Sequence, residues 1–335
     1  MQQAMIYDPF EFAQQLARLG QDGDVTDVLQ QPTPEGERAR YLKRILFDQR
    51  GAERQLVTAD DGMIARLQQL AAIAPNFAAA VGVVARAARL SQLSGKPIAV
   101  PPILLLGLPG IGKTFWARAC AKAIGVTHAE YSMNVQDDPG GLVGHSLSWR
   151  AARPGLVART LLEGPSASPV LLVDEIDKAL WSDHGDPREV FHTLFEPENA
   201  RGFVDAYLET PIRADHVIWL VTANDVGALR PSLVDRLLVL AIDAPSAEQR
   251  ATVARSIFAD LIASYGDPVA ADISDDVVEA LADAAPRQVR RLMQLALGFA
   301  AEARRRHVTP DDVRSASRQL SAGLQRPAFG FRPAR

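Results

Sequence analysis

The sequence is poor in cysteine and has little net charge, and both shortages exclude some kinds of protein. Only one of the 335 residues is a cysteine, Cys120, so a disulfide within the chain is impossible. Lysine and arginine together number 36, against 40 aspartates and glutamates, which gives a formal net charge of −4. That balance provides no general electrostatic reason to bind nucleic acid or an anionic membrane. We therefore expect neither as a partner.

Long apolar runs are also missing. No stretch is long and apolar enough to cross a bilayer. The N-terminus, Met1-Gln2-Gln3-Ala4, shows neither the basic residues nor the apolar core of a secretory signal. We expect a cytoplasmic protein. The hydrophobic content of 47% and the charged content of 23% fit a globular protein with sizeable cores.

The most informative segment is a phosphate-binding loop. Residues 107–114 are Gly-Leu-Pro-Gly-Ile-Gly-Lys-Thr, the spacing typical of such a loop. An apolar run precedes it and a helical pattern follows it, so backbone amides and a helix N-terminus would face one phosphate group. Lys113 would reach the β- and γ-phosphates, and the Thr114 hydroxyl would ligate Mg²⁺. The segment predicts nucleotide binding.

Two carboxylates end a second apolar run, residues 170–175. Asp174 is placed where a carboxylate can hold Mg²⁺ beside Thr114. Glu175 is placed to orient a water molecule against the γ-phosphate. The next charged residues, Asp177 and Lys178, could form a solvated pair on the following turn, an interpretation that we favour for Lys178.

Asn224 and Arg236 lie near two further apolar strands, and each allows two interpretations. Asn224 follows its strand directly and could hydrogen-bond the γ-phosphate or the attacking water, but asparagine is also common in turns. Arg236 just precedes the last strand. It could be a surface arginine paired with Asp235, or an arginine finger that stabilises charge on the nucleotide of a neighbouring subunit.

A third candidate, Arg287, opens a helix in the C-terminal part of the chain. It could contact the nucleotide from there. The nearby Arg290 and Arg291 are expected to be solvated residues of the helix face, although they make the choice of Arg287 less certain.

Apolar strands and helices alternate through the middle of the chain, which predicts an α/β fold with a parallel sheet. The expected strands are 103–107, 127–132, 170–174, 217–222 and 238–242. We divide the chain into a helical N-terminal region (1–95), a nucleotide-binding α/β domain (96–245), an α-helical lid of four helices (246–320) and a flexible C-terminal tail (321–335).

The order of these motifs resembles that of the AAA+ ATPases, and stretches between them resemble the ATPase module of Lon-type proteases. The similar stretches are residues 144–145, 154–155, 173–178, 185–187, 195–199, 207–208 and 222–224. The resemblance implies a P-loop AAA+ core with a parallel five-stranded sheet between helices, then a small helical lid, and here a helical N-terminal extension precedes them. It also implies ATP and Mg²⁺ as cofactors.

The resemblance assigns roles to single residues. Thr114 and Asp174 would hold Mg²⁺, Glu175 would be the hydrolytic glutamate and Arg287 the sensor in the lid. Lys113, Asn224 as the sensor on the sheet, and Arg236 as the finger in trans would act in catalysis beside Glu175. The nucleotide would contact Gly107, Pro109, Gly110, Ile111, Gly112, Lys113, Thr114, Phe115, Asp174 and Arg287.

The family grips protein chains with an aromatic residue followed by an aliphatic one in a pore loop. Trp149 and Arg150 fall at that place, so the aromatic residue is kept and the aliphatic one is not. Trp149 could instead be a core residue, but its neighbours are polar, which favours an exposed loop.

The resemblance implies a ring-forming, ATP-hydrolysing motor that remodels a protein substrate, in a chaperone-like role. The family suggests a homo-oligomer of six subunits. The chain stops at Arg335 with no Ser-Lys protease domain, so we do not expect it to cleave peptides by itself. A separate peptidase could dock on the ring.

Two other functions are kept open. An AAA+ protein that acts on nucleic acid, such as a helicase loader or a branch-migration motor, has support only from the arginines 304–306 and those of the tail. A basic cluster at a helix end is also favourable to the helix dipole alone. A regulatory switch that binds ATP and assembles without threading a chain is the third possibility.

Overall fold

A computed structural model describes residues 2–20, 25–135, 138–149, 152–181, 185–266, 272–282 and 284–324. The chain forms two compact units. The first unit contains residues 1–71, 77–107 and 113–242, and the second contains residues 72–76, 108–112 and 243–335. The phosphate-binding loop therefore contributes residues to both units.

A five-stranded sheet forms the centre of the first unit. Its strands, in spatial order, are β4 (His128–Ser132), β5 (Val170–Asp174), β8 (Ile218–Ala223), β3 (Ile103–Leu106) and β9 (Leu238–Ala241). Every neighbouring pair is parallel. The predicted fold class and all five predicted strands are confirmed. Because the strands are parallel, all their carboxyl ends lie at one edge of the sheet, where the polar residues of the motifs follow.

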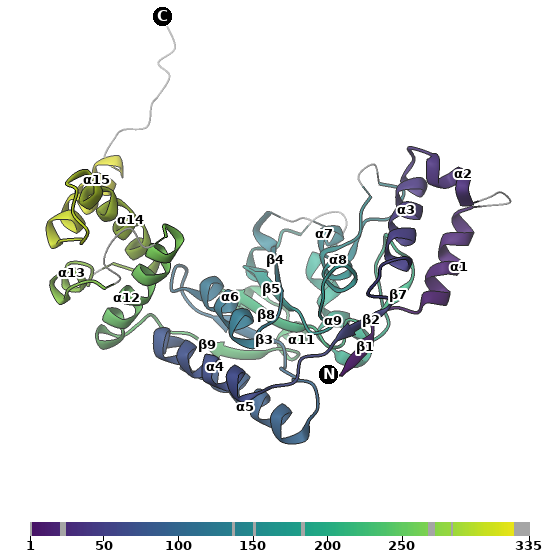
Figure 1. The fold of residues 1–335 in the computed structure, drawn as a ribbon, viewed down its shortest axis with the longest axis horizontal. Coiled ribbons are helices and arrows are strands. Elements are labelled where there is room, and N and C mark those ends of the chain that lie inside the picture. The colour runs from purple at the N-terminus through teal and green to yellow at the C-terminus, as the bar shows by residue number, and fades with distance from the viewer. Residues whose placement is uncertain are drawn as a thin grey trace, which may run out of the picture. The chain divides into compact units, whose positions relative to one another are not determined.

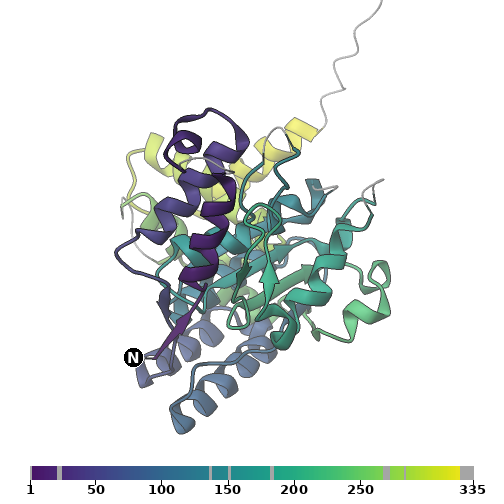
Figure 2. The same cartoon turned by 90° about the vertical axis from the view of Figure 1, so that its right-hand side faces the viewer.

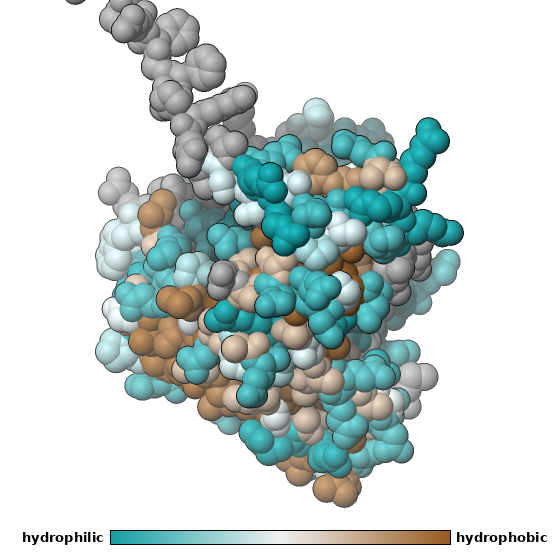
Figure 3. Space-filling model, turned by 90° about the vertical axis from the view of Figure 1, so that its left-hand side faces the viewer, coloured by the Kyte–Doolittle hydropathy of each residue, from teal (hydrophilic) through white to brown (hydrophobic). Residues whose placement is uncertain are grey.

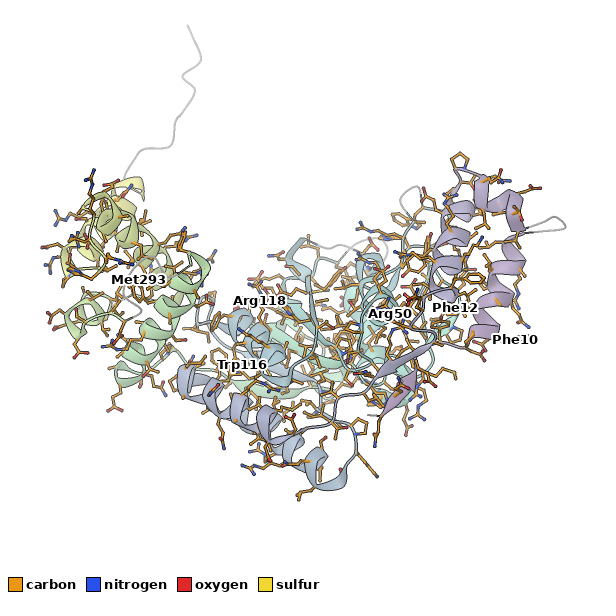
Figure 4. The ribbon with its side chains drawn as sticks, viewed as in Figure 1. Phe10, Phe12, Arg50, Trp116, Arg118 and Met293 are labelled. Carbon is orange, nitrogen blue, oxygen red and sulfur yellow. The ribbon has the colours of Figure 1, made fainter. Side chains whose placement is uncertain are left out.

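Helices cover the sheet of the first unit (Figure 1). The longer ones are α4 (Asp61–Ile73), α5 (Ala78–Ser94), α6 (Lys113–Ile124) and α8 (Leu156–Glu163). Trp116 of α6 is fully buried and stacks on Phe77, at the start of α5, with 5.6 Å between the ring centroids (Figure 4). Cys120 of the same helix is buried, and burial raises the pKa of its thiol to about 12. An aromatic stack thus joins α6 to α5.

Short elements connect these layers. They are η1 (Pro75–Phe77), η2 (Met133–Val135), α7 (Gly140–Val143), η3 (Ile176–Lys178), η4 (Pro187–Val190), α9 (Phe191–Leu194), α10 (Pro197–Ala200), β6 (Phe203–Val204), β7 (Pro211–Ile212), η5 (Val226–Ala228) and α11 (Pro231–Val234).

The N-terminal residues form three helices and a small sheet. The helices are α1 (Pro9–Leu19), α2 (Val25–Gln30) and α3 (Pro34–Leu46), and α1 and α3 lie side by side in Figures 1 and 2. Phe12 of α1 is buried, whereas Phe10 is exposed (Figure 4). Strands β1 (Gln3–Met5) and β2 (Glu53–Gln55) pair antiparallel. The predicted helical extension is present, and it also contains this small sheet, whose three-residue strands are too short to show an alternating pattern.

Buried arginines join this N-terminal region to the rest of the first unit. Arg54 is 2% exposed and donates hydrogen bonds to the carbonyl oxygens of Leu162 and Gly164, where α8 ends. Arg38 is 1% exposed and donates to the Leu208 carbonyl over 2.5 Å. Buried guanidinium groups need several acceptors to offset the loss of hydration. These bonds tie the region to the turns around the sheet.

The second unit contains the four helices expected after residue 246. They are α12 (Ala247–Ser264), α13 (Asp275–Ala280), α14 (Pro286–Glu302) and α15 (Pro310–Leu324). Ser246 caps α12 by accepting a hydrogen bond from the Gln249 amide. The fully buried Met293 lies in the core of the unit (Figure 4). Helix α15 runs four residues beyond its expected end, and residues 325–335 of the predicted tail lie outside the described residues.

Within the described residues, no single helix has the length and apolar composition needed to span a membrane. The helical segments 61–73 and 75–94 reach that length and composition only when they are taken together, and the chain bends by 118° between them. On the face shown in Figure 3, hydrophobic residues lie interspersed with hydrophilic ones.

Candidate nucleotide site

Lys113 begins helix α6 at the carboxyl edge of the sheet and is largely buried. Its ammonium group donates to the Gly107 carbonyl over 2.5 Å and to the Asn224 side-chain oxygen over 2.8 Å. Burial lowers the pKa of Lys113, and Asp177, Asp174 and Glu175 oppose that shift. The structure thus brings the lysine and the asparagine of two separate motifs together, beside three carboxylates.

Two of the loop's three glycines have a backbone conformation that residues other than glycine adopt only with strain. Gly110 has a φ of 82° and Gly112 a φ of 102°. Such positive values let consecutive amides turn toward one point, as a phosphate-binding loop requires.

Thr114 and Asp174 lie within hydrogen-bond reach. The Thr114 hydroxyl is 3.1 Å from both carboxylate oxygens of Asp174. A hydroxyl next to a carboxylate suits Mg²⁺, which prefers oxygen ligands and is held in phosphate sites by few protein groups. Among the described residues, no group of three or more histidine, cysteine, aspartate or glutamate side chains could hold a metal ion. The residues present fit an ion that the nucleotide and water help to coordinate.

Glu175 stands in a strained backbone conformation directly after the strand. Its φ of 56° and ψ of 49° lie in the left-handed region, which costs a non-glycine residue about 1–3 kcal/mol. Two bonds hold it there. Its amide donates to the Thr222 hydroxyl over 2.9 Å, and its carboxylate accepts from the Asn134 side chain over 2.7 Å. Such strain at the end of a strand points to a functional position.

Asn134 and Thr222 were not predicted as site residues. Asn134 lies in η2, a single turn after β4, and nothing in its local sequence marks it. Thr222 had a signal, because it is a hydroxyl near the end of a strand that is otherwise apolar. Its hydroxyl also donates to Asp174 over 2.5 Å.

The interpretation of Asp177 as a solvated residue is wrong. Its carboxylate is fully buried, and the Lys178 ammonium, which is half exposed, lies 3.1 Å from it. The turn η3 packs against β8, and the charge of Asp177 partly offsets the lowering of the Lys113 pKa by burial. The expectation of a solvated Lys178 agrees with its exposure.

The second unit contains an apolar cavity of about 260 Å³. Its walls combine residues of the phosphate-binding loop with residues of α12, α13 and α14. They include Leu108, Pro109, Ile111, Val253, Leu281 and Val289. The Arg287 amide lies 3.3 Å from the Gly110 carbonyl, while the Arg287 side chain is exposed. The structure therefore places Arg287 directly beside the loop. Phe115, another predicted nucleotide contact, is half-buried in the first turn of α6.

Arg236 is held within its own chain. Its Nε atom is 2.6 Å from a Glu196 carboxylate oxygen, and its Nη1 atom donates to the Ser232 carbonyl over 2.6 Å. An ion pair with Glu196 was not foreseen, since Asp235 was the expected alternative partner.

Trp149 is 45% exposed and lies over His145, with 5.6 Å between the ring centroids. A side chain with this exposure does not belong to the core, so the alternative interpretation of Trp149 as a core residue is wrong. Arg150 lies outside the described residues. At the end of the segment 144–155 that contains Trp149, the buried Asp205 accepts a hydrogen bond from the amide of Gly155 over 2.8 Å, and it also accepts from the amides of Tyr207 and Leu208.

Residues 103–241 match the ATPase family associated with various cellular activities (AAA). The chain contains an AAA ATPase domain. An AAA ATPase domain implies ATP hydrolysis and nucleotide binding. Residues 270–318 also match the family named TATA box binding protein associated factor (TAF).

Several Lon proteases are similar to the AAA ATPase domain and its surroundings. Lon protease 4 of Sorangium cellulosum is 32% identical over 192 residues, which cover 57% of this chain and 24% of that protein. The Lon protease of Flavobacterium johnsoniae is 30% identical over 167 residues, which cover 50% and 20%. The predicted relation to a Lon-type ATPase module is confirmed. The chain spans about a quarter or less of the length of the curated relatives it matches.

Among solved structures, the Thermotoga maritima RuvB Holliday junction branch migration motor is similar at 18% identity and a TM-score of 0.48. The match covers 71% of this chain and 67% of that chain. A mutant of the same protein gives 18% identity and a TM-score of 0.49, with 72% and 69% covered.

Proposed function

We propose that this chain is a Mg²⁺-dependent ATPase that assembles into a ring and remodels protein substrates. The convergence of Lys113, Thr114, Asp174, Glu175 and Asn224 at one edge of the sheet supports the ATPase part most directly. Lys113 would bind the β- and γ-phosphates, and Thr114 with Asp174 would hold Mg²⁺, which would neutralise charge on the phosphates. Glu175 would orient water, and the apolar cavity of the second unit would suit the base of the nucleotide.

Assembly is proposed because Arg236 contacts Glu196 and Ser232 of its own chain, which are not among the residues proposed to bind the nucleotide. It pairs with Glu196 at 2.6 Å. In a ring, Arg236 of one subunit would leave that pair and stabilise the γ-phosphate charge of the next subunit's nucleotide. Hydrolysis would then require oligomers.

The test of assembly is the ATPase rate per chain, measured with the mass of the particles as protein concentration rises. The rate should rise as oligomers form, and Arg236→Ala should lower it at least about tenfold while oligomers persist. Arg201→Ala is a matched control, since Arg201 is exposed and pairs with a carboxylate, Asp215, as Arg236 pairs with Glu196. A monomer with the full rate, or an Arg236→Ala variant with the full rate, contradicts the in-trans role.

A protein substrate is proposed from two observations: Trp149 is exposed, and the similar curated proteins are named proteases. The test is the ATPase rate with and without an unfolded protein such as casein. Wild type should be stimulated, and Trp149→Ala should lose the stimulation. Unchanged stimulation in that variant contradicts the role of Trp149 and favours a switch that does not thread a chain.

Action on nucleic acid remains the competing proposal, and the structure lends it little support. Of the arginines 304–306, Arg305 donates two hydrogen bonds of 2.7 Å to Asp312, which leaves less of its charge for phosphates. Single- and double-stranded DNA added to the same assay separates the two proposals. Stimulation by DNA that falls steeply with salt would favour nucleic acid.

A further inference from the structure

Thr222 contributes a buried hydroxyl to a strand that is otherwise apolar. All six residues of β8 are buried, and Thr222 is 1% exposed. Parallel strands that are covered on both faces favour aliphatic residues, and a buried hydroxyl is costly unless it is hydrogen-bonded. Valine has the same shape and would satisfy the packing. The presence of a hydroxyl at this position is therefore explained by the hydrogen bonds that it makes.

The directions of both bonds follow from the partners. The Glu175 amide can only donate, so the Thr222 oxygen accepts its hydrogen over 2.9 Å. An ionised carboxylate can only accept, so the Thr222 hydroxyl donates its single hydrogen to Asp174 over 2.5 Å. One oxygen atom thus holds the backbone of one acidic residue and the side chain of the other.

We propose that Thr222 is a positioning residue for ATP hydrolysis, which aligns Asp174 and Glu175 with respect to each other. The inference rests on the hydrolytic roles given to those two residues in the proposed function. Glu175 occupies a backbone region that a non-glycine residue leaves when nothing holds it there. Without the bond from Thr222, its carboxylate would turn away from the attacking water, and Asp174 would lose a donor that orients its oxygens toward the metal.

The bonds of Thr222 involve neither Lys113 nor the apolar cavity that we propose for the phosphates and the base of the nucleotide. Lys113 is held by Gly107 and Asn224, and Thr222 does not line the apolar cavity. Loss of the Thr222 hydroxyl should therefore lower kcat and leave nucleotide affinity nearly unchanged. That split distinguishes positioning from a general loss of structure.

The experiment compares Thr222→Val and Thr222→Ser in the full chain. It measures kcat and KM for ATP at several Mg²⁺ concentrations, the affinity for a fluorescent ADP analogue, and the thermal unfolding midpoint. Thr222→Val should lower kcat by about 10–100-fold, as loss of a group behind a metal ligand usually does. Its ADP affinity should stay within about twofold. Thr222→Ser keeps the hydroxyl and should restore most of the rate.

Val221→Ala is the matched control, because Val221 is buried on the same strand and points to the opposite face. It should lower the unfolding midpoint and leave kcat near the wild-type value. A wild-type kcat in Thr222→Val, a Thr222→Ser variant as slow as Thr222→Val, or an ADP affinity that falls together with kcat would each overturn the role of Thr222.

A parallel assay of Glu175→Gln distinguishes a failure of the role of Thr222 from a failure of the proposed hydrolytic site. If Glu175→Gln is as active as wild type, the proposed hydrolytic site itself is wrong. If Glu175→Gln is slow while Thr222→Val is fast, only the role of Thr222 is overturned.

Discussion

The carboxyl edge of the sheet and the segment that carries Trp149 differ in how they are held. At the edge, Lys113, Asp174 and Glu175 each make two or more bonds to neighbouring elements. Trp149 is 45% exposed, and the buried bonds near it lie at Gly155 and Asp205. Bond formation and cleavage need fixed geometry, whereas contact with varied chains needs accessible side chains. The side chains at the carboxyl edge are thus held in fixed positions by hydrogen bonds. The Trp149 segment is held at its end, by the bond between Gly155 and Asp205, and leaves the tryptophan accessible.

The largest effect is expected from a substitution that removes a catalytic group at the carboxyl edge and leaves the Trp149 segment unchanged. Glu175→Gln keeps the size of the side chain and can still accept from Asn134 through its amide oxygen, but it is no longer a base. We expect kcat to fall by about 10²–10⁴-fold, with nucleotide affinity retained. Steady-state ATPase and ADP-analogue binding measure both. Glu248→Gln, in the exposed first turn of α12, is the control and should behave as wild type.

The second prediction concerns the anchor of the Trp149 segment. Burial raises the pKa of the Asp205 carboxyl from 3.8 to about 6, against the lowering effect of three backbone amides. Between these values the folded state keeps a proton that the unfolded state has lost. The stabilising contribution is therefore complete below pH 3.8 and disappears as the pH rises through about 6.

Asp205→Asn removes this titration, so the two proteins should respond differently to pH. From pH 5 to pH 7.5, wild type should lose roughly 1–2 kcal/mol of unfolding free energy relative to Asp205→Asn. Urea unfolding at both pH values measures it. Equal pH dependence in the two proteins would show that Asp205 does not titrate in this range.

The third prediction tests the rigidity of the same anchor. A Cβ atom on Gly155 would lie 2.3 Å from the Leu142 carbonyl oxygen and 2.4 Å from the Gly144 amide nitrogen, both of them backbone atoms. Gly155→Ala should cost about 1–3 kcal/mol of unfolding free energy. Gly202→Ala is matched, since a Cβ there meets nothing within 4 Å. Equal stability of the two variants would mean that the backbone near Gly155 adapts freely.

The smallest effect on stability and basal activity is expected from a substitution in the exposed Trp149 segment. Trp149→Ala removes a ring that is 45% exposed and contacts His145. We expect the basal ATPase rate and the stability to stay close to those of wild type, within about 0.5 kcal/mol in stability. Stimulation by casein should be lost, as described above. A large fall in the basal rate would show that Trp149 supports the site and does not only contact a substrate.

Much of the fold could be predicted because its signals are local. Four of the five strands are short, nearly apolar runs, and the phosphate-binding loop has the spacing typical of its motif. The strands β1 and β2 were missed because each is three residues long. For Asp177 the sequence left a solvated turn residue open as an interpretation, and only the tertiary structure shows that its carboxylate is buried.

The sequence by itself determined the strand segments, the phosphate-binding loop and the acidic pair at the end of β5, because each depends on residues adjacent in the chain. The tertiary structure alone decided which groups hold these residues. Asn134 reaches Glu175 across 41 positions, and Thr222 reaches Asp174 across 48. Parallel pairing brings the ends of distant strands to one edge, and a hydrogen bond between them depends on register and side-chain direction. Local sequence patterns contain neither quantity.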